Sequence, residues 1–250
     1  MTVIARQEHI AFQANLYADP NPTRRNLHGT RKAWVDSAIR EFVRPGIKVL
    51  EVGVGCGIFT RSLSQTGADV TAIDINPDFI DGVSTLKNVK AEVMDATQPL
   101  RVEPQDVALS SEVLEHVPPA GSIAMLKAIH AALKPGAIFV LTTPQRYATM
   151  ELAARLLRFP PILALARKIY GSADELGHIN LLTASALRKQ LAEAGFTIER
   201  DARFGFYLPV IAEFGGETGR SVLVAIERVI RHVPVLRGLL WTQAYILRAV

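Results

Sequence analysis

The chain has 250 residues, of which 49% are hydrophobic and 21% charged, and this composition indicates one compact globular protein with ample length for a buried core. Its net charge of +4 is a modest excess without a basic run interleaved with aromatic residues, which argues against binding of nucleic acid. One cysteine excludes an internal disulfide framework, and the lack of a secretory apolar region or an uncharged run of about 20 residues leads us to expect a cytoplasmic protein.

Helical patterns dominate the first 45 residues. A short helix is expected from His9 to Tyr17, a chain break at Asp19-Pro20-Asn21-Pro22, and a second helix from Thr30 to Val43. We expect residues 1–45 to form a helical cap over a ligand pocket. Its cations could meet a charged ligand or form a solvated face, and they are Arg24, Arg25, His28 and Arg31.

The apolar run Val49–Val52 leads into three glycines at alternate positions, Gly53, Gly55 and Gly57, and then into helical spacing. This pattern predicts a strand, a tight turn and a helix, with backbone that can lie directly against a ligand. A dinucleotide fingerprint would carry its third glycine where this chain has Ile58. The turn therefore favours a nucleoside without a pyrophosphate.

A second apolar strand, Val70–Ile73, ends at Asp74, whose carboxylate could bind a ribose diol. Strands and helices then alternate along the chain, with a helix from Pro77 to Leu86 and strands at 89–93, 106–110 and 137–144, the last two separated by a helix from Ala120 to Leu133. This alternation predicts a parallel sheet with helices on both faces, and such sheets bind ligands at the carboxyl ends of their strands.

Polar residues follow two of these strands. Asp95 follows the third strand, where it could bind a base amino group or form a turn. Ser111 follows the fourth strand and leads into Glu112, Glu115 and His116. Two carboxylates and an imidazole are therefore expected at the mouth of the same crevice.

Five segments, in this order and spacing, resemble the class I S-adenosylmethionine (SAM)-dependent methyltransferases. They are VLEVGVGCG, AIDINP, AEVMDA, DVALSSEVLEHVPP and LKPGAIFVLTTP. The resemblance runs from about Asn21 to Arg200 and is strongest to the branch that contains the ubiquinone-pathway O-methyltransferases. It implies a Rossmann-like, seven-stranded, mostly parallel sheet whose last strand is antiparallel, with SAM as the cofactor.

The resemblance also implies roles for individual residues. The glycine turn would hold the amino-acid part of SAM, Asp74 the ribose, and Asp95 the adenine, with Ser111 beside the cofactor. Arg31 best matches an arginine that binds the SAM carboxylate, although this chain has two extra residues between Arg31 and Gly53. The expected cofactor-binding residues are Arg31, Glu51, Gly53, Gly55, Gly57, Asp74, Ile75, Asp95, Ala96 and Ser111.

Methyl transfer from a sulfonium needs a base when the acceptor atom keeps a proton, and His116 and His178 are the candidates because imidazole titrates near neutral pH. His116 could instead fix the cofactor loop. The series Glu112, Glu115 and His116 resembles a divalent-metal motif of some relatives. Because many relatives without a metal carry similar residues, we expect no metal.

Two segments depart from the minimal fold. The insert 149–182 is expected to form two apolar helices, Met150–Arg158 and Ile162–Tyr170, as a lid that packs over a hydrophobic pocket in preference to resting on an anionic membrane. A helix Ala184–Ala194 capped by Thr183 and a strand Phe196–Arg203 follow. The second insert, 204–237, contains a helix over 221–232, and a strand over 241–247 closes the 46–250 domain.

The function predicted from the sequence is transfer of a methyl group from SAM to a small, hydrophobic acceptor, at oxygen. Transfer to nitrogen or carbon of a natural-product or lipid acceptor is an alternative that keeps the cofactor. A non-catalytic SAM-binding protein is another, although an intact glycine turn and acid argue against it. Ile58 disfavours a hydride-transferring enzyme. The oligomeric state stays open.

Overall fold

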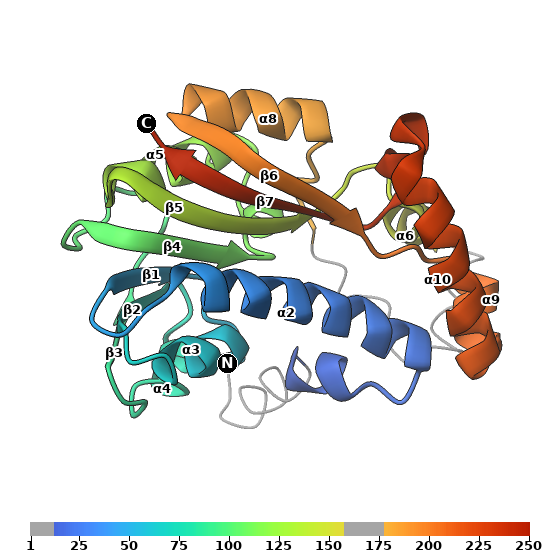
Figure 1. The fold of residues 1–250 in the computed structure, drawn as a ribbon, viewed down its shortest axis with the longest axis horizontal. Helices are drawn as coiled ribbons and strands as arrows, with labels where there is room; N and C mark the ends of the chain where they lie inside the picture. Colours follow the sequence, from blue (N-terminus) through green and yellow to red (C-terminus); the bar gives the residue numbers. More distant parts are fainter. Residues whose placement is uncertain (1–12, 158–177) are drawn as a thin grey trace.

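A single seven-stranded sheet organises the computed structural model, which describes residues 13–157 and 178–250 (Figure 1). The strand order is β3-β2-β1-β4-β5-β7-β6, and every pairing is parallel except those of β7, which runs antiparallel to both neighbours. The strands are β1 Lys48–Val52, β2 Asp69–Asp74, β3 Val89–Val93, β4 Gln105–Ser111, β5 Leu133–Pro144, β6 Phe196–Phe204 and β7 Thr242–Ala249. The predicted Rossmann-like fold and its antiparallel last strand are confirmed.

Helices cover both faces of the sheet, which is why its central strands read as continuous apolar runs. One face packs against α2 (Pro22–Phe42), α3 (Ile58–Ser64) and α4 (Pro77–Asp81). The opposite face packs against α5 (Ser122–Ala131) and α8 (Ala184–Glu193).

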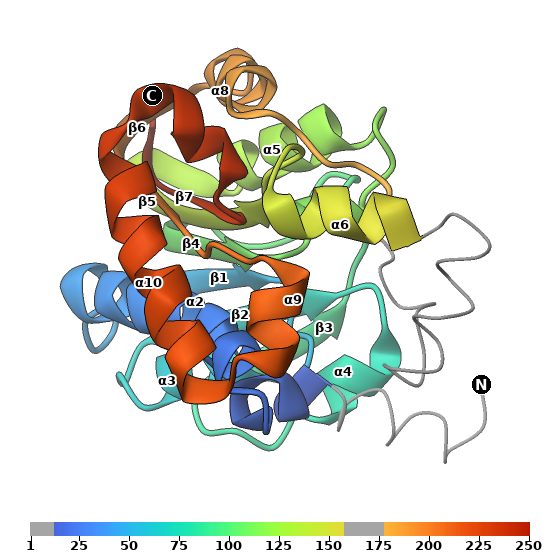
Figure 2. The ribbon, with the colours of Figure 1, turned by 90° about the vertical axis from the view of Figure 1, so that its right-hand side faces the viewer.

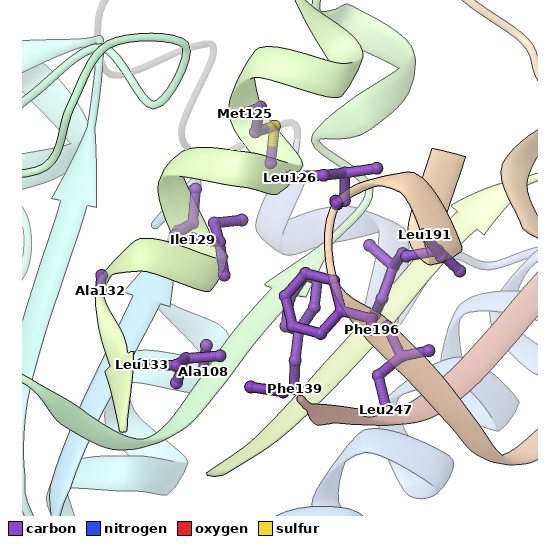
Figure 3. Close-up of a cluster of buried hydrophobic side chains, with 14 of the residues drawn as sticks. Ala108, Met125, Leu126, Ile129, Ala132, Leu133, Phe139, Leu191, Phe196 and Leu247 are labelled. Atoms are coloured by element: carbon purple, nitrogen blue, oxygen red, sulfur yellow. The ribbon is translucent and has the colours of Figure 1, made fainter. Parts of the chain in front are cut away.

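Figure 3 shows the second of these cores, where Met125, Leu126 and Ile129 descend from α5 toward the sheet. Phe139 of β5 and Phe196 of β6 meet there with ring centroids 5.2 Å apart. These side chains are fully or almost fully buried, so the position of the last two strands is fixed by packing against α5 and α8.

Several elements begin or end at different residues from those expected. The helix predicted from Thr30 begins at Pro22, because the Asn21 side chain accepts hydrogen bonds from the N–H groups of Thr23 (2.9 Å) and Arg24 (3.1 Å). Asn-Pro is thus a helix start here, with proline at the first helical position, and not a chain break. The helix after Pro77 ends at Asp81 and not at Leu86.

The insert helices gather at one end of the molecule. Figure 2 shows α6 (Thr149–Leu157), α9 (Pro209–Phe214) and α10 (Gly216–His232) there. A third buried cluster joins Leu27 of α2 to Ala148, Ala212 and Trp241, so the second insert packs on the amino-terminal helix. The division of the chain into a helical cap, residues 1–45, and a SAM-binding domain, residues 46–250, stays a prediction.

Parts of the sequence predictions lie outside the described residues. The second lid helix, Ile162–Tyr170, is one, and residues 9–12 of the helix predicted from His9 are another. The rest of that helix is described, with residues 13–15 helical and a turn of 3-10 helix at Leu16–Ala18. Among the helices that are described, none combines the length and apolar character needed to cross a membrane.

Candidate functional site

The glycine turn after β1 is built by backbone that other residues could not adopt. Gly53, Gly55 and Gly57 have φ angles of 86°, 52° and 74°, all in the left-handed region. A Cβ at Gly53 would lie 2.1 Å from Cγ2 of Val113, and one at Gly57 would lie 2.5 Å from Cγ1 of Val83. The three glycines are therefore required by conformation and by space.

Asp74 is joined to this turn at the end of β2. Its Oδ2 accepts the N–H of Gly55 at 3.3 Å, and its Oδ1 accepts the N–H of Asn76 at 2.8 Å. Ile75 follows with 70% of its surface exposed at the same edge. The structure thus brings together the turn, the acid and an apolar side chain, and their contact with a cofactor stays a prediction.

Glu51 lies two residues before the turn and is buried. Burial, and the nearby charge of Asp74, raise the pKa of its carboxyl group to about 8. One of its oxygens, Oε2, has no hydrogen-bond partner among the described residues. Glu51 is thus a neutral acid at pH 7, which can donate a hydrogen bond as well as accept one.

Asp95 and Ala96 follow β3 at the same edge of the sheet. The Oδ1 atom of Asp95 accepts hydrogen bonds from the backbone N–H (2.9 Å) and the hydroxyl (2.8 Å) of Thr97. Asp95 is exposed and Ala96 half-buried. The turn-forming role is therefore present, and contact with an adenine stays a prediction.

The loop after β4 has a strained backbone and is held by several hydrogen bonds. Glu112 has a φ of 59°, which costs a non-glycine residue about 1–3 kcal/mol. Its N–H donates to the carbonyl of Thr142 at 2.9 Å, and its Oε1 accepts the Thr142 hydroxyl at 3.0 Å. The Ser111 hydroxyl lies 2.8 Å from the same threonine oxygen. These contacts hold Ser111 at the carboxyl end of β4.

Arg31 reaches this loop from α2. Its Nη1 lies 3.0 Å from Oε2 of Glu112, its Nη2 donates to the Tyr17 hydroxyl at 3.1 Å, and its guanidinium carbon is 5.7 Å from the centre of the Trp241 ring. Burial lowers the pKa of Arg31, but the charge of Glu112, together with the contacts to Tyr17 and the charge of Glu115, outweighs burial and the pKa is raised. Sequence reasoning missed this pair, because 81 positions separate the two residues.

Two of the other candidate cations of the amino-terminal helix pair with carboxylates away from this loop, and the third, His28, has its Nδ1 atom 3.3 Å from Nη2 of Arg31. Arg24 pairs with Asp19 (2.9 Å) and Glu213 (2.6 Å), and Arg25 lies 3.5 Å from Glu217. Burial and the charges of Arg31 and Arg24 lower the pKa of His28 to about 3, so it is neutral. Of the four candidate cations, the structure places Arg31 at the loop after β4.

Glu115 is fully buried in the same loop. Its Oε2 accepts the Thr143 hydroxyl at 3.0 Å, and its backbone carbonyl accepts the N–H groups of Ile179 and Asn180, each at 3.0 Å. Burial and the charge of Glu112 raise the pKa of its carboxyl group to about 8. The backbone bonds hold the end of the first insert against the loop after β4.

The two candidate bases, His116 and His178, are brought together, with ring centroids 5.4 Å apart. The Nδ1 atom of His178 lies 3.0 Å from Oε1 of Glu151, a carboxylate that is 4% exposed and also accepts the Trp241 Nε1–H at 3.0 Å. Burial lowers the pKa of His178, but the hydrogen bond and charge of Glu151, with the charges of Glu115 and Glu112, together outweigh burial and raise the pKa above its usual value. Sequence reasoning missed Glu151, since α6 carried no recognisable catalytic spacing.

Glu115, His116 and His178 each offer one ligand atom, and these atoms lie within 4.8 Å of one another. One carboxylate and two imidazoles are ligands that a divalent cation accepts. This group contains His178 in place of Glu112 of the sequence motif, because the Glu112 carboxylate is paired with Arg31. The expectation that the protein holds no metal stays a prediction.

A cavity of about 380 Å³ opens beside His178, between α6 and the segment 178–182. Glu151 and His178 line it together with the apolar Pro119, Ala154 and Leu182. A larger hollow of about 500 Å³ lies at the opposite end of the sheet, where β1, β2 and β3 begin. Because open parallel sheets bind ligands at their carboxyl ends, the smaller cavity is the candidate site.

Comparison with known proteins finds that the chain is similar to methyltransferases. The family model of a methyltransferase domain matches residues 25–200. The ubiquinone biosynthesis O-methyltransferase of Xanthomonas campestris pv. campestris is 30% identical over 147 residues, which are 56% of this chain and 60% of that protein. The enzyme of the same name from Xylella fastidiosa is 33% identical over 144 residues, 54% of this chain and 57% of that protein. The matches thus span at most about three fifths of these relatives.

Two solved structures share the fold at low identity. Magnesium protoporphyrin IX methyltransferase from Synechocystis, with bound SAH, gives a TM-score of 0.60 at 18% identity and covers 99% of each chain. The N-methyltransferase NodS from Bradyrhizobium japonicum gives 0.60 at 16% identity, with 98% of this chain and 97% of that chain covered. Since the family model covers most of the chain and the sheet has the family's topology, the protein belongs to the class I S-adenosylmethionine-dependent methyltransferases.

Proposed function

We propose that the protein binds SAM at the carboxyl ends of β1 and β2 and transfers its methyl group to an oxygen atom of a small, largely apolar acceptor. The observation that supports this proposal most directly is the pair of Glu151 and His178, which lines a cavity at the same edge of the sheet as the glycine turn. The names of the relatives support oxygen as the acceptor atom, and the pair supplies a base for it.

The cofactor side fits a nucleoside with a charged amino-acid tail. Each carboxylate oxygen of Asp74 accepts one backbone N–H group and retains a lone pair for a ribose hydroxyl. The Nε–H of Arg31 is buried without a hydrogen-bond partner among the described residues, so it is available to the carboxylate of the tail. When bound, SAM supplies an electrophilic methyl group on a sulfonium.

The acceptor side is suited to removing a proton from a hydroxyl or phenol. If the Nδ1–H of His178 donates to Glu151, the Nε2 atom is left as an acceptor. Proton transfer to Nε2 makes an imidazolium, and the buried carboxylate of Glu151 stabilises that charge. Positioned general bases contribute about 10²–10⁴-fold to rate, and alignment of the two reactants contributes more.

The test is transfer of labelled methyl from SAM to catechol, with the product identified by mass and NMR. We expect an O-methyl product, and we expect His178→Gln to lose about 10²–10⁴-fold in kcat while the affinity for S-adenosylhomocysteine stays unchanged. His232→Gln, on the exposed end of α10, is the matched control. An unaltered kcat in His178→Gln, or a product methylated at carbon, would overturn the assignment.

A further inference from the structure

Two arginines line the cavity beside His178 without a use in the chemistry described above. Arg146 and Arg155 are both exposed at its mouth. Within residues 13–157 and 178–250, neither forms a salt bridge, whereas Arg24 and Arg31 are each paired with a carboxylate. Their charges are therefore available to a ligand.

Different elements carry the two guanidinium groups to the cavity. Arg155 lies one helical turn after Glu151 on α6, so both side chains share the face of α6 that borders the cavity. Arg146 follows β5, where Gln145 pairs with Leu182 and the Arg146 N–H donates to the Leu182 carbonyl at 3.3 Å. The backbone at Arg146 is thus anchored to the segment that follows His178, and both arginines line the same cavity.

The cavity has an excess of positive charge. Its charged or titratable lining groups are the two arginines, Glu151 and His178. The carboxylate of Glu151 accepts hydrogen bonds from His178 and from the indole N–H of Trp241 and forms no salt bridge with either arginine, so one positive charge remains in excess when His178 is neutral. A ligand that enters next to Pro119 and Leu182 therefore meets a cavity mouth that favours an anionic group.

We propose that the acceptor is an amphiphilic molecule whose anionic oxygen group, a carboxylate or a phosphate, binds Arg146 and Arg155 while its hydroxyl lies at His178. Guanidinium groups match the geometry of both anions and form charge-assisted hydrogen bonds with them. The volume of about 380 Å³ suits a single ring that bears both groups. This inference deepens the proposed function and rests on it for the placement of the hydroxyl.

The test compares the binding of 3,4-dihydroxybenzoate with that of its neutral methyl ester, by calorimetry with S-adenosylhomocysteine present. We expect the acid to bind about tenfold or more tightly than the ester, and the preference to fall below about threefold in the Arg146→Gln/Arg155→Gln double variant. Arg101→Gln, an exposed arginine at the opposite end of the sheet, should keep the full preference. Phenyl phosphate in competition assigns the site to phosphate as well if it displaces the acid, and to carboxylate alone if it does not.

Equal affinities for acid and ester, a preference that survives in the double variant, or no binding of either compound would overturn the inference. Methyl transfer is measured separately on both compounds. Tighter binding of the acid without methylation of either compound would contradict the proposed function and leave the anion site standing. Equal binding of both compounds together with methylation of both would support the proposed function and contradict the anion site.

Discussion

Two halves of the site lie at the carboxyl edge of the sheet, and one is formed mainly by backbone whereas the other is formed mainly by side chains. The turn at residues 53–57 is made of backbone in a conformation that glycine alone adopts freely, and Asp74 is bonded to that backbone. The half beside β4 and β5 is made of side chains from three separate segments, the buried Glu115 and Glu151 and the half-buried His178. The first half is fixed by local conformation, and the second by tertiary packing.

This difference predicts how each half fails. A change in the backbone-built half should distort its shape, because an added Cβ combines backbone strain with a close contact to a neighbouring side chain. A change in the half built from side chains should leave the fold in place and alter a charge or a pKa.

The largest effect is expected for Gly53→Ala. The new Cβ would lie 2.1 Å from Cγ2 of Val113 at a φ of 86°, so we expect a loss of about 2–4 kcal/mol in the free energy of unfolding and no detectable binding of S-adenosylhomocysteine. Chemical denaturation and calorimetry measure the two losses.

Gly46→Ala is the matched control for that variant. Its φ of 80° imposes a similar backbone strain, but a Cβ there meets nothing within 4 Å. We expect a destabilisation of about 1 kcal/mol and normal binding. If both variants behaved alike, backbone strain alone would explain the turn, and close packing against Val113 would not matter.

A smaller effect, on pH dependence, is expected for Glu151→Gln. His178 must be neutral to accept a proton, so activity rises with pH through its pKa, which Glu151 holds above the usual value. Removing the carboxylate lowers that pKa and shifts the rising limb of the kcat profile to lower pH, with about a tenfold lower plateau. An unmoved limb would show that Glu151 merely supports the structure.

The smallest effect is expected for Glu115→Gln, and it concerns stability. Between about pH 4.5 and 8 the unfolded chain releases the Glu115 proton while the folded protein retains it, so this group lowers wild-type stability as pH rises. The amide cannot ionise and still accepts the Thr143 hydroxyl. We expect the variant to gain about 1 kcal/mol relative to wild type between pH 5 and pH 8, which is the free energy of roughly one pKa unit.

Urea denaturation at the two pH values measures that gain. Glu193→Gln, at an exposed pair with Lys127, should show no such dependence. Parallel stability curves for wild type and Glu115→Gln would contradict the buried, neutral state assigned to this carboxyl group.

The same contrast explains what the sequence predicts well. Glycines at alternate positions after an apolar strand indicate a local backbone conformation, and Asp74 indicates a polar position at a strand end. Thr183 was predicted to cap a helix, and the structure confirms this, because its side chain accepts the N–H of Ala186. The sheet follows from strand and helix alternation, because buried parallel strands leave continuous apolar runs. These features depend on neighbours in sequence.

Contacts between distant segments could not be predicted in this way. The pairs Arg31–Glu112 and Glu151–His178 each join residues far apart in the chain, and no periodicity records which carboxylate meets which cation. Asn21-Pro22 was interpreted as a break because its consequence depends on whether the asparagine side chain turns back to cap the helix, which the structure shows. Pairings of this kind require the fold first.

The central claim is that Asp74 and the glycine turn bind a sulfonium nucleoside. Its most direct test is calorimetric titration of S-adenosylhomocysteine into the wild-type protein, Asp74→Ala and Asp69→Ala, the last at the opposite end of the same strand. The account predicts one site per chain in wild type and Asp69→Ala, and affinity at least about 30-fold weaker in Asp74→Ala, because charge-assisted hydrogen bonds to the ribose are lost. No heat of binding in wild type, or equal affinity in all three proteins, would contradict it.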